Sequence, residues 1–255
     1  IPTGMNRGAF DFVTNPVDFN DLEITLEKTI GELNIVREGL AYHDKLLSIE
    51  HDLMVAREIQ RAIMPKAIPG LEWADIDGSM EAARQIGGDF YDYFMMDDHR
   101  LGFVIGDVSG KGIPAAIFMA VSRTLIRATG LKGMSPRDCM NYVNHLLCTE
   151  SVNSMFVTVF YGMLDLETDT LHYVNAGHNP PILLRHNGST EVFPMTDNIV
   201  LGVYDGYSFK TNSIPFLKDD TLVMYTDGVT EAFNQNNEEY GFETLHTLLK
   251  EQVLG

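Results

Sequence analysis

Residues 101–116 read LGFVIGDVSGKGIPAA, and this stretch decides the fold class. It opens with an apolar β-like run that ends in Asp107, after which the chain turns through Gly110 and Gly112. Pro114 then begins a run that favours helix, a position where its fixed φ angle and missing N–H are tolerated. A strand that leads through a glycine turn into a helix predicts a domain of mixed secondary structure.

Two other aspartates stand in the same kind of place, at the end of an apolar run beside glycine. Asp89 follows the glycine pair of GGDFYD, and Asp227 ends the run LVMYT just before Gly228. A sheet holds a carboxylate at a strand end, and adjacent glycines let backbone and water approach it closely. Hard divalent cations prefer such oxygen ligands. Asp89, Asp107 and Asp227 are therefore candidate metal-binding and catalytic residues.

This composition suits hydrolysis of a phosphate ester. Two divalent ions about 4 Å apart can generate hydroxide at neutral pH and hold both oxygens of an in-line displacement at phosphorus. Asp-Gly is also an ordinary turn dipeptide, and three examples at strand ends lower the odds of plain turns without settling them. The stretch GDVSGKG is no nucleotide loop, because Gly112 follows Lys111 where Ser or Thr is needed.

The overall composition excludes several classes of partner. The chain has 255 residues, 45% of them hydrophobic, so it can bury a substantial core. Its 36 acidic residues against 18 basic ones give a formal net charge of −18, which repels nucleic acid and anionic membrane. Cys139 and Cys148 form neither a disulfide framework nor a metal-ligand spacing. With no apolar span or export signal in view, we expect a cytoplasmic protein.

A long segment without proline precedes these motifs. From about Asp18 to Met64 almost every residue favours helix, and Asn20 or Asp21 suits the N-cap position. Two out-of-phase series with 3,4 spacing run along it: Leu33, Val36, Leu40, His43 and Leu47, then Ile49, Leu53, Ala56, Gln60 and Ile63. Shifted heptads predict a coiled coil that dimerises the chain. The alternative is one amphipathic helix packed on its own domain.

From Ile68 onward, short apolar runs are separated by Gly, Asn and Asp. The predicted strands are 101–108, 155–164, 170–176, 182–185 and 221–226. Helices are predicted at 114–128 and from Ser135, the N-cap residue before Pro136. Strands that arrive in hairpins around two consecutive helices favour an α+β sandwich over alternating βαβ units.

Four motifs in order give the chain a specific resemblance. ARQIGGDFYD, GDVSGKGIPAA, NAGHNPP and LVMYTDGVTE resemble the motifs of PPM-type metal-dependent serine/threonine protein phosphatases, in the SpoIIE-like bacterial branch. The resemblance covers about Asp52 to Gln252, and AREIQRAIMPK within it resembles the regulatory helix that enters this domain. It implies an αββα sandwich of two antiparallel β-sheets flanked by helices, with two Mg²⁺ or Mn²⁺ ions between the sheets.

The same resemblance implies roles residue by residue. Asp107 would bridge the two ions, with the Val108 carbonyl as a backbone ligand. Asp89 would serve one ion and Asp227 the other. Arg84, five residues before Asp89, matches the phosphate-binding arginine of related phosphatases, and ordinary surface charge is the alternative.

One departure from the family pattern concerns the C-terminal side. Family members normally end with a strand preceded by an Asp-Asp-x-Thr turn that supplies another metal ligand, and the sequence up to Gly255 lacks it. The stretch Asp219-Asp220-Thr221 is a different element, because it leads into the run that ends at Asp227. Metal affinity in this form is therefore open.

A second resemblance lies at the front of the chain. GAFDFVTNPVDFNDLEITLEKTI, residues 8–30, resembles the last strand and helix of a response-regulator receiver domain, with Asn15-Pro16 in place of the usual Lys-Pro. We therefore expect residues 1–20 to be the end of a receiver domain, 21–66 a coiled-coil linker and 67–255 the phosphatase domain. An unrelated strand and helix is the alternative.

The function predicted from these features is metal-dependent hydrolysis of phosphoserine or phosphothreonine on a partner regulatory protein in bacterial signal transduction. The resemblance implies a substrate of the anti-sigma-factor antagonist type. Two alternatives stay open: a catalytically weak module that docks a partner through residues 114–128, and a hydrolase of small phosphoesters. A homodimer through the N-terminal helix is expected, and no nucleic-acid or membrane partner.

Overall fold

The computed structural model describes residues 18–65, 73–82, 85–150, 155–195 and 197–253. The chain forms two compact units, Ile1–Ala56 and Arg57–Gly255. The receiver-domain strand that the resemblance of residues 8–30 implies lies outside the described residues, which begin at Asp18. No helix in the described part of the chain is both long and apolar enough to span a bilayer.

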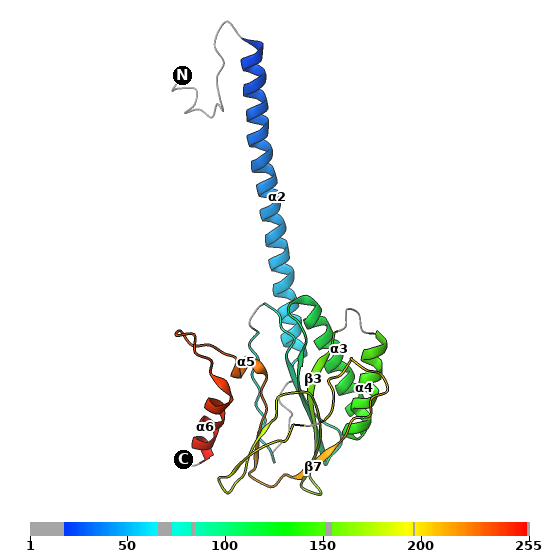
Figure 1. Ribbon diagram of the computed structural model, residues 1–255. Helices are drawn as coiled ribbons and strands as arrows, with labels where there is room; N and C mark the ends of the chain where they lie inside the picture. Colours follow the sequence, from blue (N-terminus) through cyan, green and yellow to red (C-terminus); the bar gives the residue numbers. More distant parts are fainter. Residues whose placement is uncertain (1–17, 66–72, 83–84, 151–154, 196, 254–255) are drawn as a thin grey trace. The chain divides into compact units, whose positions relative to one another are not determined.

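A single helix, α2 (Phe19–Ile63), runs unbroken through 45 residues (Figure 1). The predicted helix from Asp18 to Met64 is confirmed. The predicted N-cap is wrong, because the Oδ1 atom of Asp18 accepts a hydrogen bond from the Asn20 N–H at 2.9 Å. A short acceptor side chain just before the first helical residue satisfies a donor that the helix itself cannot pair. Leu33, Leu40 and Leu47 are exposed along α2.

The eight strands of the described residues form two antiparallel sheets. The five-stranded sheet has the order β1-β2-β3-β4-β7, and the three-stranded sheet has the order β6-β5-β8. Their bounds are β1 (Phe90–Met95), β2 (Arg100–Val108), β3 (Val157–Asp165), β4 (Thr170–Ala176), β5 (Ile182–Leu184), β6 (Thr190–Val192), β7 (Asn212–Pro215) and β8 (Thr221–Val223). The five predicted strands correspond to β2, β3, β4, β5 and β8.

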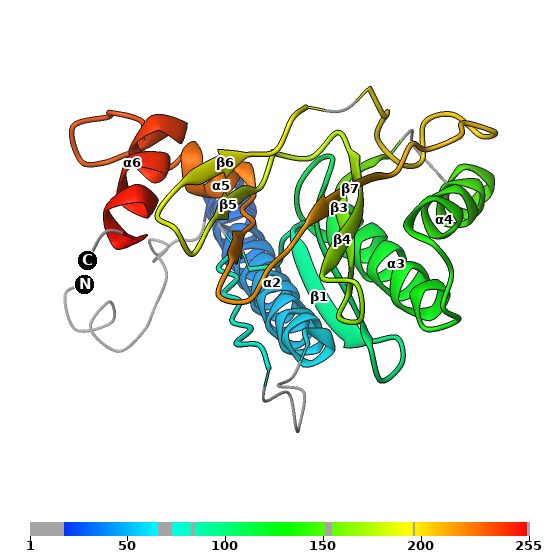
Figure 2. The same ribbon diagram turned by 90° about the horizontal axis from the view of Figure 1, so that it is seen from below.

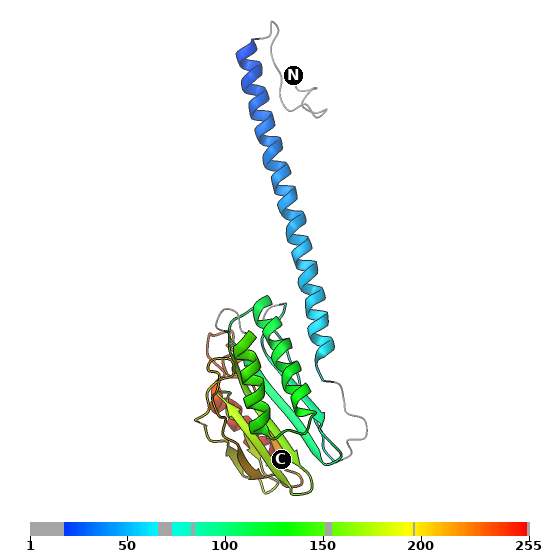
Figure 3. The ribbon, with the colours of Figure 1, turned by 90° about the vertical axis from the view of Figure 1, so that its right-hand side faces the viewer.

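Helices cover the outer faces of both sheets. α3 (Ile113–Gly130) and α4 (Pro136–Glu150) lie side by side on one face of the five-stranded sheet (Figures 2 and 3). Both were predicted, and Ser135 caps α4 by accepting the Asp138 N–H at 3.2 Å. The one-turn helix α5 (Asp227–Thr230) and α6 (Gly241–Val253) were not predicted; α6 packs against β5 of the smaller sheet.

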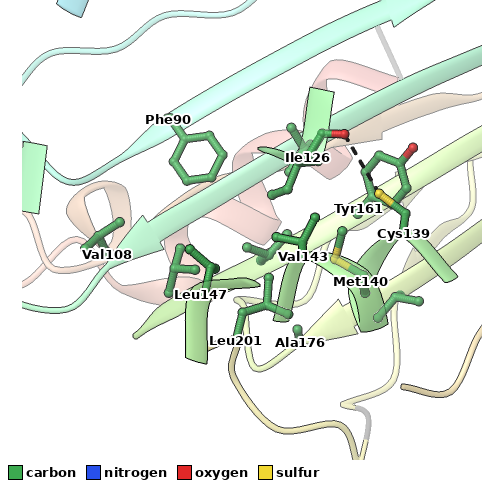
Figure 4. Packing of buried hydrophobic residues seen from close by; sticks show 14 of the residues in the cluster. Phe90, Val108, Ile126, Cys139, Met140, Val143, Leu147, Tyr161, Ala176 and Leu201 are labelled. Atoms are coloured by element: carbon green, nitrogen blue, oxygen red, sulfur yellow. Dashed lines mark hydrogen bonds between the residues drawn. The ribbon is translucent and has the colours of Figure 1, made fainter. Parts of the chain in front are cut away.

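Three apolar layers hold this arrangement together. The first lies between the helix pair and the five-stranded sheet, where Val143 and Leu147 of α4 and Tyr161 of β3 belong to one buried cluster (Figure 4). Phe160, the neighbour of Tyr161, faces the opposite way into a layer with Leu183 of the smaller sheet. The third layer joins that sheet to α6. Both faces of β3 are therefore buried, and the predicted αββα sandwich is confirmed.

Candidate active site

The three aspartates that the sequence pointed to lie together in the structure. Asp89 immediately precedes β1 and Asp107 is the next-to-last residue of β2, and the pairing of Phe90 with Gly106 sets these two aspartates side by side. Asp227 begins α5, after the smaller sheet. The Thr226 hydroxyl donates to Asp89 Oδ2 at 2.6 Å, which bonds the turn before Asp227 to the start of β1.

Burial and like charges together shape the electrostatics of this cluster. The pKa of Asp107 is raised to about 7, first by burial, then by a hydrogen bond with the Asp89 side chain and by the charges of Asp89, Asp227 and Glu231. Among the described residues, no lysine or arginine forms an ion pair with these aspartates. Protonation relieves the repulsion, and a bound cation would relieve it more strongly by favouring the ionised form.

The chemistry of these donors fits a hard divalent cation, although they do not form a finished coordination shell. Within the described residues, no three His, Cys, Asp or Glu side chains are grouped so that they could hold an ion. Asp89 and Asp107 share a hydrogen bond instead. A Cβ atom on Gly88 would lie 2.9 Å from the Val108 carbonyl oxygen, so glycine leaves room beside this predicted backbone ligand.

Several neighbours of the cluster were missed in the sequence. Glu231 acts on Asp107 through its charge, and its position four residues after Asp227 was an available signal. His178, in the motif NAGHNPP, is 1% exposed, and its Nδ1 atom lies 2.9 Å from the Thr158 hydroxyl. Burial lowers the pKa of His178 to about 4. No local pattern indicates that partnership, because 20 residues separate His178 from Thr158.

A comparison with protein families connects the fold and the cluster. The family model for stage II sporulation protein E (SpoIIE) matches residues 97–254, which include Asp107 and Asp227. The chain belongs to the SpoIIE family.

Curated relatives of this SpoIIE-family chain include a phosphoserine phosphatase. It is 29% identical over 224 residues to the phosphoserine phosphatase RsbU of Bacillus subtilis, an alignment that covers 86% of this chain and 65% of RsbU. It is 31% identical over 221 residues to protein IcfG of Synechocystis sp. (strain PCC 6803), covering 76% of this chain and 35% of IcfG. The chain thus spans between about a third and two thirds of these relatives.

Solved structures share the architecture. The SiaA-PP2C domain of Pseudomonas aeruginosa superposes with a TM-score of 0.67 over 82% of this chain and 84% of that chain, at 16% identity. The structure of the RsbU and RsbW domains of Rv1364c from Mycobacterium tuberculosis gives a TM-score of 0.55 at 27% identity, over 68% of this chain and 46% of that one. The SpoIIE-family domain therefore has the PP2C fold.

The last turns of α2 belong to the same compact unit as the SpoIIE-family fold. Gln60 is 5% exposed, and its side-chain amide bonds twice to Gly87. Its Nε2 atom donates to the Gly87 carbonyl at 2.8 Å, and its Oε1 atom accepts the Gly87 N–H at 3.3 Å. Since Gly87 stands two residues before Asp89, this contact fastens the helix end to the loop that carries one of the clustered aspartates.

The predicted phosphate-binding residue, Arg84, lies outside the described residues. Its role therefore stays a prediction from the motif ARQIGGDFYD. The neighbouring residues from Gln85 onward are described, and they lead directly into Gly87 and the cluster.

Proposed function

We propose that this SpoIIE-family domain hydrolyses phosphoserine or phosphothreonine on a partner regulatory protein. The single observation that carries the proposal is the cluster of Asp89, Asp107 and Asp227, three carboxylates from distant parts of the sequence that repel one another. Stability alone would not bring these groups together, because like charges in a half-buried place destabilise the fold. Similarity to the phosphoserine phosphatase RsbU over 86% of this chain supports the reaction class.

The residues that would hold two Mg²⁺ or Mn²⁺ ions are Asp89, Asp107, Asp227 and the Val108 carbonyl. When bound, such ions lower the pKa of water and offset the charge that develops at phosphorus. The chain itself contributes the positions of these groups. The Thr226 hydroxyl donates to Asp89 Oδ2 at 2.6 Å and so holds the Asp89 carboxylate in place. Arg84 would donate hydrogen bonds from its planar guanidinium to the phosphoryl oxygens.

The substrate class follows from the relatives rather than from a shaped pocket. We propose a phosphorylated protein of the anti-sigma-factor antagonist type, met in the cytoplasm. Likeness to the phosphoserine phosphatase RsbU supports a phosphoserine substrate. The strongly acidic chain, with a net charge of −18, disfavours nucleic acid and anionic membrane as partners.

We further propose that residues 1–20 end a receiver domain, that 21–66 form a coiled-coil linker, and that 67–255 form the phosphatase domain. Leu40 and Leu47 are 61% and 51% exposed along α2, which leaves an apolar seam for a second copy of the chain. Replacing both with Glu should make the chain monomeric in light scattering and change its turnover. A double variant that stays dimeric would remove the coiled-coil proposal.

The central experiment measures phosphate release with and without Mn²⁺ from three substrates: an aryl phosphate, a phosphoserine peptide and a sugar phosphate. The proposal expects Mn²⁺-dependent release from the peptide and the aryl phosphate, and a much slower rate with the sugar phosphate. Release from none of them would indicate a docking module. Preference for the sugar phosphate would indicate a small-molecule hydrolase.

A further inference from the structure

One buried imidazole lies behind the carboxylate cluster. His178 follows β4 and is held by a closed turn, in which Asn175 Oδ1 accepts the His178 N–H at 2.8 Å. The Asn175 side-chain amide also donates to the His178 carbonyl at 3.0 Å. Gly177 between them adopts a φ of 74°, a conformation that glycine takes without strain. The backbone therefore fixes where the ring stands.

The ring connects to the turn that carries Asp107. Its Nδ1 atom lies 2.9 Å from the Thr158 hydroxyl, and the same hydroxyl lies 3.4 Å from the Asp107 carbonyl oxygen. Thr158 pairs with Asp107 across β2 and β3, so this contact reinforces the backbone ladder at its last residues. A shift of the ring would therefore act on Asp107 through a single intermediate side chain.

The ring also faces the other two aspartate turns. The Tyr225 backbone, two residues before Asp227, and the charge of Asp89 both favour the protonated ring, against a larger effect of burial. The Nε2 atom is buried and has no hydrogen-bond partner of good geometry among the described residues. His178 thus interacts with β3, with the turn after β8 and with the start of β1.

We propose that His178, linked to Thr158, is a positioning residue that fixes the spacing between the Asp107 turn and the Asp227 turn. That these two turns hold metal ions rests on the proposed function, whereas the positioning of the turns by His178 does not. Groups that orient the ligands of a metal site from behind typically alter metal affinity by about 10–100-fold when they are removed. A histidine that only filled the core would alter stability and leave both turns as they are.

The first test needs no metal. Three backbone hydrogen bonds report on the two turns: the Ser109 N–H to Phe156 O at 2.9 Å, the Val229 N–H to Thr226 O at 3.1 Å and the Glu231 N–H to Asp227 O at 2.7 Å. Hydrogen exchange of the metal-free chain, followed by mass spectrometry, is expected to quicken at both turns about tenfold in His178→Phe and in Thr158→Val. Unchanged exchange at the turns in both variants would overturn the proposal.

The chain offers a matched control. His172 Nδ1 lies 2.7 Å from the Ser213 hydroxyl, an exposed imidazole–hydroxyl pair between β4 and β7. His172→Phe and Ser213→Ala should leave exchange at both turns at the parent level. Faster exchange in these controls as well would show that the effect belongs to the sheet rather than to His178, and would also overturn the proposal.

The second test measures Mn²⁺ affinity by calorimetry on the same variants. Affinity should fall about 10–100-fold in His178→Phe and Thr158→Val, while Thr158→Ser, which keeps the hydroxyl, should stay within about twofold of the parent. Should His178→Phe fail to fold, Thr158→Val removes the same link with nearly the same shape. A parent that binds no Mn²⁺ and releases no phosphate would defeat the proposed function, and the exchange experiment would still decide the role of His178.

Discussion

Asp89 and Asp92 stand three residues apart at the start of the same strand, and the fold surrounds them in opposite ways. The Asp92 side chain is fully buried and pairs with Arg123 at 2.9 Å and with Arg127 at 2.7 Å, both on α3. Asp89 and its neighbour Asp107 are partly exposed and meet other acids instead. Two arginines compensate the charge of Asp92, whereas no lysine or arginine among the described residues pairs with Asp89 or Asp107.

This difference teaches how to separate structural from functional carboxylates. A buried acid with two arginines needs no ligand, and here it clamps α3 to the edge strand of the larger sheet. A cluster of acids that raises the pKa of Asp107 lowers stability until a proton or cation binds. The same change from Asp to Asn should therefore lower activity in the acidic cluster and lower stability at Asp92.

The largest effect is expected from Asp107→Asn or Asp227→Asn. Each should reduce Mn²⁺-dependent turnover well below a tenth of the parent value, because losing a ligand charge raises the barrier by several kcal/mol. Urea denaturation of the metal-free variants should show stability equal to or above the parent, since a repelling charge is gone. The exposed Asp98→Asn is the control, and turnover above about a tenth in either variant would disprove its ligand role.

Asp92→Asn should act on stability instead. Removing one member of a buried ion pair leaves Arg123 and Arg127 uncompensated, which should lower the free energy of unfolding by about 3–5 kcal/mol. Turnover per folded molecule should stay within a few-fold of the parent. Asp97→Asn supplies a matched control, because Asp97 pairs with Arg100 at the surface and its loss should matter far less. Equal losses in the two variants would contradict the structural role of Asp92.

His178 should make stability depend on acid pH. Its pKa is lowered to about 4 in the fold, whereas an unfolded histidine binds a proton near pH 6.5. The neutral ring therefore contributes stability above pH 6.5, and this contribution is lost as the pH falls from 6.5 to 4. Between pH 7 and pH 4 the metal-free parent should lose roughly 3 kcal/mol more than His178→Phe in urea denaturation. Parallel pH curves for the two proteins would rule out a buried neutral ring.

Gln60→Ala should give the smallest effect of this series. The substitution leaves the N–H and C=O of Gly87 without their side-chain partner, at a cost of about 1–3 kcal/mol in unfolding free energy. Because Gly87 leads to Asp89, the Mn²⁺ concentration needed for half-maximal turnover should rise as well. Gln85→Ala, at an exposed position in the same loop, should change neither quantity. A stability loss without any change in the Mn²⁺ requirement would show that Gln60 anchors the helix and does not affect the site.

The sequence alone was sufficient wherever a pattern is local. The long helix, the capped helix α4 and the strands β2, β3 and β4 follow from runs of residues that each show one periodicity. Strands β6 (TEV) and β7 (NSIP) were missed because these short segments are mostly exposed and contain no apolar run, unlike the equally short β5. β1 was missed because its first residues lie in the motif GGDFYD, which was interpreted as a candidate site and not as a strand.

The sequence by itself also determined the residue types of the site, since Asp beside Gly at a strand end is readable without a fold. Only the tertiary structure decided which of those acids lie together and which do not. The bond between Thr226 and Asp89 joins residues 137 positions apart, whereas Asp92 pairs with two arginines on α3. Contacts of this kind arise from the packing of sheets and helices, so the charge that a carboxylate meets is a property of the fold.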